Sequence, residues 1–188
     1  MYDLIRKVEN INEKVLSERR KRPQPALDDK SITSWNGLMI EALAYAGGVS
    51  KNEEYVRVAS KAADDLLITL RGKDGELLHV ARGGKAKLNA YLDDYAALIL
   101  GLLELHRVTG EKHWLQEADH IGNAMVEKLW EPGRGFRYAV PTVAFLIASL
   151  RDTYDGAFPS GNSLAVRALA GLAADGHPRY ARYAAETL

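Results

Sequence analysis

Three segments of eleven residues are apolar around nearly the whole circumference of a helix, and they constrain the fold more than any other feature. They are GLMIEALAYAG (37–47), YAALILGLLEL (95–105) and LAVRALAGLAA (164–174), and each contains a single charged residue. A helix of this composition must be covered on most of its faces, in a protein interior or in a membrane. Because a membrane-spanning helix needs about 20 apolar residues, the segments are predicted to be interior helices of a globular protein.

Amphipathic helices alternate with these interior helices. Over 53–71 and 112–129, apolar residues recur every three or four positions and charged residues occupy the other side, and a shorter segment of the same kind starts at 178. Pairing each interior helix with the amphipathic helix that follows it predicts three helical hairpins, over residues 33–71, 91–130 and 160–188.

Repeated hairpins with one buried and one half-exposed helix form either a solenoid or a closed two-layer toroid. The connections at 72–90 and 131–159 are long, whereas a solenoid has short and uniform loops, so the toroid is favoured. A further helix over 1–22 is expected to be the outer member of a hairpin whose inner partner is not in this sequence. The predicted fold is therefore all-α, a single helical domain over 1–188 that forms about half of an (α/α) toroid and looks cut at both ends.

Composition argues against several classes of function. Lys and Arg together number 25, as do Asp and Glu, so the formal net charge is zero and no nucleic-acid partner is expected. Without cysteine the chain has no disulfide, thiolate metal site or redox pair. The five histidines are scattered and lack metal-ligand spacing, so neither a metal site nor a cofactor is predicted. Neither a signal peptide nor a membrane span is evident, and a cytoplasmic protein is expected.

A dense polar cluster precedes each interior helix. The clusters are LDDKSITSWN (27–36), GGKAKLNAYLDDY (83–95) and RDTYDGAFPSGNS (151–163). If the interior helices run parallel around one axis, their first turns meet at one mouth, which carries unpaired backbone N–H groups and the positive ends of the helix dipoles. Such a mouth suits a carbohydrate or polyol, with aromatic side chains as flat surfaces for sugar rings.

Acid/base chemistry on a glycoside needs two carboxyl groups with unequal pKa values. We expect one member of each adjacent Asp pair to face the mouth and the other to be structural, and the sequence leaves open which one. The catalytic candidates are Asp28, Asp29, Asp93, Asp94 and Asp155, with Asp152 as a further carboxylate. The candidates for substrate binding are Lys30, Trp35, Asn36, Lys85, Tyr91, Tyr154, Ser160 and Asn162.

Each cluster also has a structural explanation. Asp29, Thr33, Asp93 and Ser160 precede or begin helices, where such residues are common N-caps. Trp35 on an interior helix is more often a core residue than a binding surface. The competing hypothesis is a non-catalytic scaffold, in which Lys, Arg and backbone N–H groups engage all of the aspartates.

The clusters resemble a known family. RPQPALDDKSITSWNGLMIEALA, GGKAKLNAYLDDYAALILGLLELH and DTYDGAFPSGNSLA are similar to the C-terminal helical region of the thioredoxin-domain-containing, YyaL-like family that includes spermatogenesis-associated protein 20. The resemblance implies an (α/α)6 barrel similar to six-hairpin glycosidases and to N-acylglucosamine and cellobiose 2-epimerases. The chain lacks the family's thioredoxin-like domain, so no redox centre is implied here.

The resemblance also implies consequences for activity and assembly. Epimerase chemistry leads us to expect histidines at the mouth, but none of the five lies in the three clusters, which argues against that chemistry. With about three of six hairpins, an open half-toroid would expose apolar faces. We therefore expect self-association, with a homodimer completing the toroid and the apolar segment 140–150 contributing to the contact.

Overall fold

Helical hairpins form the body of the protein. A computed structural model describes residues 2–72, 76–140, 151 and 153–187. Its helices are α1 (Tyr2–Arg20), α2 (Thr33–Ser50), α3 (Glu53–Thr69), α4 (Leu92–Thr109), α5 (Lys112–Leu129), α6 (Gly161–Ala174) and α7 (Ala181–Thr187), with a 3-10 turn η1 (Pro178–Tyr180) before α7. No helix in these described ranges has the length and apolarity needed to cross a bilayer.

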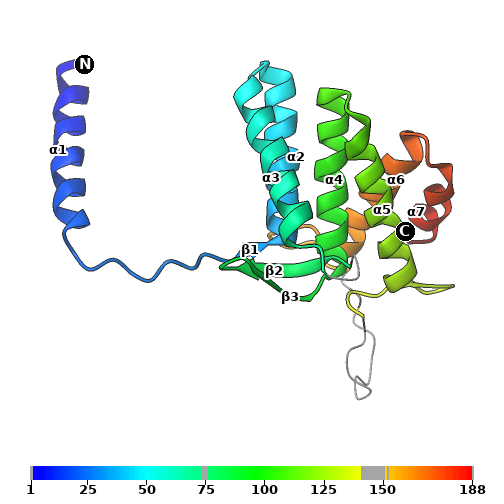
Figure 1. Ribbon diagram of the computed structural model, residues 1–188. Helices are drawn as coiled ribbons and strands as arrows, with labels where there is room; N and C mark the ends of the chain where they lie inside the picture. The colour runs from blue at the N-terminus through cyan, green and yellow to red at the C-terminus, as the bar shows by residue number, and fades with distance from the viewer. Residues whose placement is uncertain (1, 73–75, 141–150, 152, 188) are drawn as a thin grey trace.

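The apolar helices α2, α4 and α6 lie side by side and form the inner layer (Figure 1). Helix α4 is central, and Leu98 and Leu102 are two of its many fully buried residues. The amphipathic helices α3 and α5 pack on the outside, each burying one stripe and exposing the other side. The inner and outer layers of a toroid segment are thus built from the two helix types that the hydrophobic pattern distinguishes.

Glycines allow α2 and α4 to approach unusually closely. A Cβ atom added at Gly37 of α2 would lie 2.6 Å from the backbone carbonyl carbon of Ala97 in α4, and one at Gly101 would lie 2.9 Å from the carbonyl oxygen of Gly37. Both gaps are shorter than van der Waals contact, so only glycine fits where the two backbones meet. This close contact fixes the relative height of the two helices and hence the relative position of their first turns.

The connection expected as a plain loop at 72–90 contains a β-hairpin. Strands β2 (Leu78–Arg82) and β3 (Lys85–Asn89) pair antiparallel, and β1 (Ser31–Ile32) pairs with β2 to complete a three-stranded sheet. Gly83 and Gly84 both have positive φ, as a tight two-residue turn requires. The second long connection also contains a pair of short strands, β4 (Trp130–Glu131) and β5 (Gly135–Phe136). Figure 1 shows the three-stranded sheet against the lower ends of α2 and α4.

Helix α1 stands apart from the helical body. Every residue of α1 that the structure describes is exposed, and a coil segment over residues 23–30 leads from it toward β1 (Figure 1). Its apolar stripe, which includes Leu4, Val8, Ile11 and Val15, is therefore open to solvent. The residues at 141–150, which contain most of the segment expected to mediate self-association, lie outside the described residues, as does Asp152.

Candidate functional site

The three polar clusters meet at the end of the body where α2, α4 and α6 begin, which we call the N-terminal rim. The backbone N–H of Ser34 in α2 donates a hydrogen bond to Oδ1 of Asp94 in α4 (2.9 Å). At the start of α6, a Cβ atom added at Gly161 would lie 3.4 Å from the backbone nitrogen of Asp93. The first turns of all three inner helices are therefore in contact through α4, as their parallel arrangement predicts.

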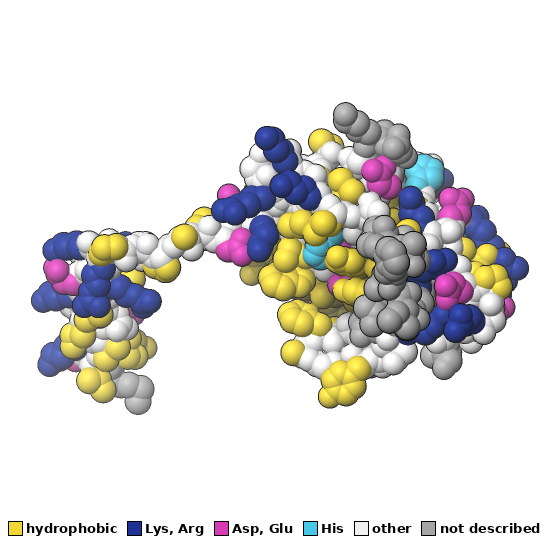
Figure 2. Space-filling view, turned by 90° about the horizontal axis from the view of Figure 1, so that it is seen from below, with side chains coloured by type: hydrophobic (Ala, Val, Ile, Leu, Met, Phe, Trp, Pro, Cys, Tyr) yellow, Lys and Arg dark blue, Asp and Glu magenta, His cyan; other side chains and the backbone are white. Residues whose placement is uncertain are grey.

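Figure 2 views this end of the molecule from below. Hydrophobic side chains gather beside a histidine and acidic side chains near the middle of the face, and Lys and Arg side chains lie around it. This mixture of apolar surface with a few charged groups is typical of sites for polar ligands that also present flat apolar faces.

Asp94 is fully buried at the centre of the rim and holds its parts together. Its Oδ1 accepts the hydrogen bond from Ser34, and its Oδ2 accepts one from the backbone N–H of Tyr91 (2.9 Å), which closes a capping box at the start of α4. Burial raises the pKa of Asp94. The hydrogen bond from the Tyr91 N–H lowers this pKa, and the nearby negative charge of Asp93 raises it further. Both oxygens are engaged within the protein, so Asp94 is the structural member of its pair.

His79 of β2 is a rim residue that the sequence clusters did not include. Its Nδ1 lies 2.7 Å from Oδ2 of Asp94, and its ring meets that of Tyr91 edge-on, with the centroids 4.8 Å apart. His79 lies outside the three clusters but is held at the rim, so the argument against epimerase-like chemistry, which considered the clusters alone, does not apply to it. The short apolar-rich segment LLHVAR directly before the Gly83–Gly84 turn was the available signal, since a strand bounded by such a turn predicts a hairpin that could bring His79 back to the helices.

Asp93 differs from its neighbour because it has an unsatisfied oxygen. Within the described residues its buried Oδ1 makes no hydrogen bond, while the residue as a whole is partly exposed. An unpaired buried carboxylate oxygen costs free energy, so such groups in native proteins call for an explanation. Asp93 is thus the member of this pair whose carboxylate the described residues do not fully satisfy.

Exposed aromatic rings lie at the same end. Trp35 and Phe158 are stacked, with centroids 6.1 Å apart and an interplanar angle of 9°, and their exposed fractions are 60% and 59%. Trp35 is therefore a surface residue, contrary to its structural explanation as a core residue. Tyr91 stacks on Tyr138 at 5.1 Å. Flat exposed rings on a polar rim can contact the apolar faces of sugar rings.

The third cluster caps α6. Ser160 is its N-cap, with Oγ accepting a hydrogen bond from the N–H of Ser163. Asp155 accepts hydrogen bonds from the N–H of Ser160 (2.7 Å) and from the hydroxyl of Ser163 (3.1 Å), and these bonds lower its pKa. Asn162 lies in the first turn of α6, and Tyr154 is the most exposed aromatic residue of the cluster. Asp155 and Ser160 thus have a structural role.

The first cluster is divided between two places. Asp28 pairs with Lys30 (3.1 Å), and both side chains are exposed. Asp29 pairs with Arg82 of the β-hairpin, at 2.5 Å between Oδ1 and Nε, and this hydrogen bond lowers its pKa. Asn36 donates to the carbonyl oxygen of Ile32 (2.7 Å). Arg and Lys therefore neutralise the Asp28–Asp29 pair, and no described contact links it to Asp93.

Several hollows lie away from the aromatic rim. Asp29, Asn36 and Arg82 line an open hollow of about 430 Å³ between the hairpin and α3. The exposed Lys85 follows the Gly83–Gly84 turn of the same hairpin.

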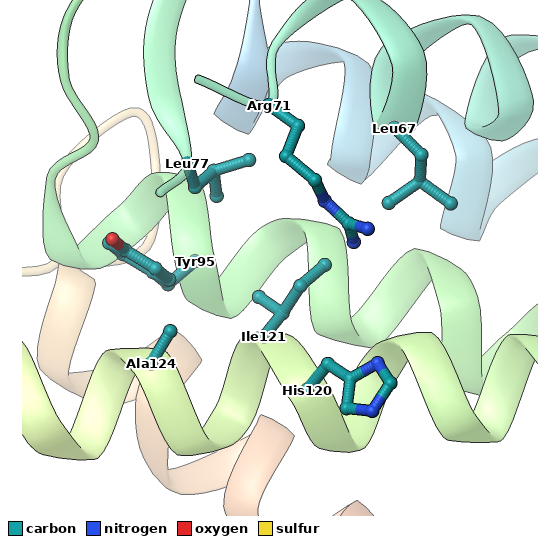
Figure 3. Close-up of a pocket in the computed structure, with 7 residues that line it drawn as sticks. All are labelled: Leu67, Arg71, Leu77, Tyr95, His120, Ile121 and Ala124. Atoms are coloured by element: carbon teal, nitrogen blue, oxygen red, sulfur yellow. The ribbon is translucent and has the colours of Figure 1, made fainter. Parts of the chain in front are cut away.

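A second, smaller pocket, of about 230 Å³, lies between α3, α4 and α5. Its seven lining residues, drawn in Figure 3, include Arg71, His120 and the buried Tyr95, and none of them is among the predicted site residues. In the described part of the chain, no group of three His, Asp or Glu side chains could hold a metal ion.

The sequence is homologous to spermatogenesis-associated protein 20. No family model matches the chain. The mouse and human proteins are each 30% identical to it over 84% of this chain, and an uncharacterized protein of Caenorhabditis elegans is 30% identical over 87%. The matched part is only 21–23% of those proteins, so the chain spans about a fifth of their length. The relationship expected from the three motifs is therefore confirmed.

Solved structures identify the fold class. An unsaturated glucuronyl hydrolase specific for heparin superposes with a TM-score of 0.69 at 17% identity, over 88% of this chain and 47% of that one. Cellobiose 2-epimerase from Spirochaeta thermophila gives 0.69 at 14% identity (87% and 43%), and a GH76 alpha-mannanase from Bacteroides thetaiotaomicron gives 0.68 at 17% (86% and 44%). The chain thus has the fold of the six-hairpin (α/α)6 toroid class, confirming the predicted fold class, and spans less than half of each neighbour.

Proposed function

We propose that the N-terminal rim binds a carbohydrate or polyol and that Asp93 is the carboxylate that contacts it. The observation on which this depends is the buried Oδ1 of Asp93, which has no hydrogen-bond partner among the described residues. A sugar hydroxyl would supply the missing donor. The comparisons support a sugar ligand, because the neighbours in fold include glycoside hydrolases and sugar epimerases.

The aromatic pair Trp35–Phe158 would supply the apolar half of the site. A sugar ring stacked on an exposed aromatic ring releases ordered water while its hydroxyl groups remain free to reach Asp93. The two features are linked through the backbone, since Ser34 next to Trp35 bonds to the residue after Asp93. If the site is catalytic, Asp93 would act as an acid or base on a glycoside.

A non-catalytic scaffold is the second candidate, and one specific observation favours it. Asp29, Asp94 and Asp155 are all engaged by protein groups, as polar groups that only hold the hairpins in register would be, and Asp94 is the buried one of the three. Asp28 is likewise engaged, in an ion pair with Lys30. Among the described members of the adjacent Asp pairs, Asp93 is the exception, because its buried Oδ1 has no hydrogen-bond partner. The two hypotheses therefore differ in what they predict for Asp93.

The test is calorimetric titration with cellobiose, mannobiose and a heparin disaccharide, comparing the parent protein with Asp93→Asn. Binding is expected to weaken about tenfold, since a hydrogen bond to a charged group contributes about 1.5–3 kcal/mol. Thermal stability should stay the same or rise, because the substitution removes an unpaired charge. Asp64→Asn on the solvent side of α3 is the matched control. The absence of binding by the parent to all three sugars would favour the scaffold.

A further inference from the structure

We propose that His79 is the second polar group of the rim, with its Nε2 accepting a hydrogen bond, and during turnover a proton, from a hydroxyl group of the bound carbohydrate. This inference rests on the proposed carbohydrate-binding function. It assigns to Asp94 the role of a positioning residue that acts through His79 and does not itself reach the ligand.

Three elements hold His79 in place. Strand β2 pairs with β1 next to α2, and the hydroxyl of the buried Thr33 at the start of α2 donates to the carbonyl oxygen of Leu78 (2.6 Å). The imidazole then meets Asp94 of α4 on one side and the ring of Tyr91 on another. A side chain anchored in this way loses little conformational entropy when a ligand binds.

Asp94 selects the tautomer of His79. An ionised carboxylate only accepts hydrogen bonds, so the Nδ1 at 2.7 Å must carry the hydrogen that it donates to Oδ2. In neutral imidazole Nε2 then keeps its lone pair and is an acceptor. Among the described residues no group donates to Nε2, and the side chain of His79 remains 22% exposed. The available acceptor therefore belongs to a partly accessible ring at the rim.

The same geometry permits proton transfer. When a ligand hydroxyl gives its proton to Nε2, the electron pair of the O–H bond stays on the ligand oxygen and the imidazole becomes imidazolium. The buried carboxylate of Asp94 stabilises that cation, while the charge of Asp93 acts on Asp94 and the ring of Tyr91 packs edge-on against His79. The proton then returns from Nε2 to the same ligand oxygen, so the site ends in its original state.

The residue of β3 that lies across from His79 has a strained backbone. Leu78 pairs with Asn89 and Val80 with Lys87, which leaves Leu88 across from His79. Leu88 has a φ of +62°, a conformation that costs a non-glycine residue about 1 kcal/mol. Residues held in such conformations cluster at functional sites, because the surrounding structure must enforce them.

The experiment uses two substitutions that separate the two ring nitrogens. His79→Asn retains a donor near the position of Nδ1, so the bond to Asp94 can persist, but it has no counterpart of Nε2. His79→Gln places its amide near the position of Nε2 and has no counterpart of Nδ1, so it loses the bond to Asp94. Affinity for cellobiose and mannobiose should fall about tenfold in His79→Asn, while its melting temperature stays within about 2 °C of the parent. His79→Gln, with an amide near the position of Nε2, should keep more of the affinity and lose more stability. His113→Asn, a histidine on the outer helix α5, is the control.

Nitrogen NMR of the histidine rings tests the tautomer without a ligand. At neutral pH the Nε2 of His79 should give the signal of an unprotonated nitrogen and Nδ1 that of a protonated one, and sugar should shift the Nε2 signal. Unchanged sugar affinity in His79→Asn, or a protonated Nε2 with a bare Nδ1, would overturn the inference while leaving the proposed function intact. Failure of the parent protein to bind any sugar would instead overturn both.

Discussion

Asp93 and Asp94 are adjacent in the sequence, but successive helix residues point about 100° apart, and their surroundings differ accordingly. Asp94 is fully buried and accepts hydrogen bonds from Ser34 and Tyr91, whereas Oδ1 of Asp93 accepts none from the described residues. The same side chain is therefore fully satisfied by the protein at one position and only partly satisfied at the next.

Replacing Asp94 by Asn should destabilise the protein. The amide group of Asn must face one of the N–H groups that the carboxylate now satisfies, which leaves a donor unpaired in the interior. The expected loss is about 1–3 kcal/mol of unfolding free energy, measured by urea denaturation. Asp28→Asn, at an exposed ion pair with Lys30, should change stability by less than about 0.5 kcal/mol. Equal effects of the two substitutions would contradict the role assigned to Asp94.

The stability difference between the parent and Asp94→Asn should also depend on pH. Burial raises the pKa of Asp94 above the ordinary aspartate value of 3.8, so the folded state binds this proton more tightly than the unfolded state. Tighter proton binding by the folded state therefore stabilises the fold fully below about pH 3.8. This stabilisation is lost as the pH rises through the pKa that Asp94 has in the folded state. The advantage of the parent should shrink as the pH rises above about 4 in urea titrations, and growth of that advantage with pH would contradict the raised pKa.

At the scale of elements, the contact between α2 and α4 depends on backbone proximity at Gly37. The added methyl group of Gly37→Ala would meet the backbone of Ala97, which cannot move without displacing α4. We expect a loss of about 2–3 kcal/mol, measured by thermal and urea unfolding. Gly48→Ala is the comparison, since its methyl group would meet a side-chain methyl of Val108 at 2.9 Å and no backbone atom, and its loss of stability should be smaller. Similar losses in both variants would rule out this explanation.

At the scale of the whole molecule, one face of the inner helix α2 is uncovered. Met39, Tyr45 and Val49 are each 58–69% exposed. Soluble monomers rarely expose contiguous apolar surface of this kind, so we expect the chain to self-associate through α2. Light scattering at micromolar concentration should show a dimer, and Met39→Glu with Val49→Glu should shift it to monomer. Ile68→Glu, an exposed apolar residue of α3, is the control, and a monomeric parent would contradict the prediction.

The sequence by itself determined the helices and their layers, because the periodicity of apolar residues is a local property of the chain. The apolar segments at 95–105 and 164–174 became the buried inner helices α4 and α6, and the polar clusters marked where these helices begin. The β-hairpin was missed because the helical pattern dominated, although its Gly83–Gly84 turn is a recognisable signal.

Only the tertiary structure decided which side chains share the rim. Asp94 meets Ser34 across 60 positions and His79 across 15, and neither separation corresponds to a helical or strand repeat. The pairing depends on how closely α2 packs on α4 and on the path of β2, both of which follow from long-range contacts. For this reason the sequence could name both aspartates as candidates, whereas their different roles depended on neighbours that folding brings together.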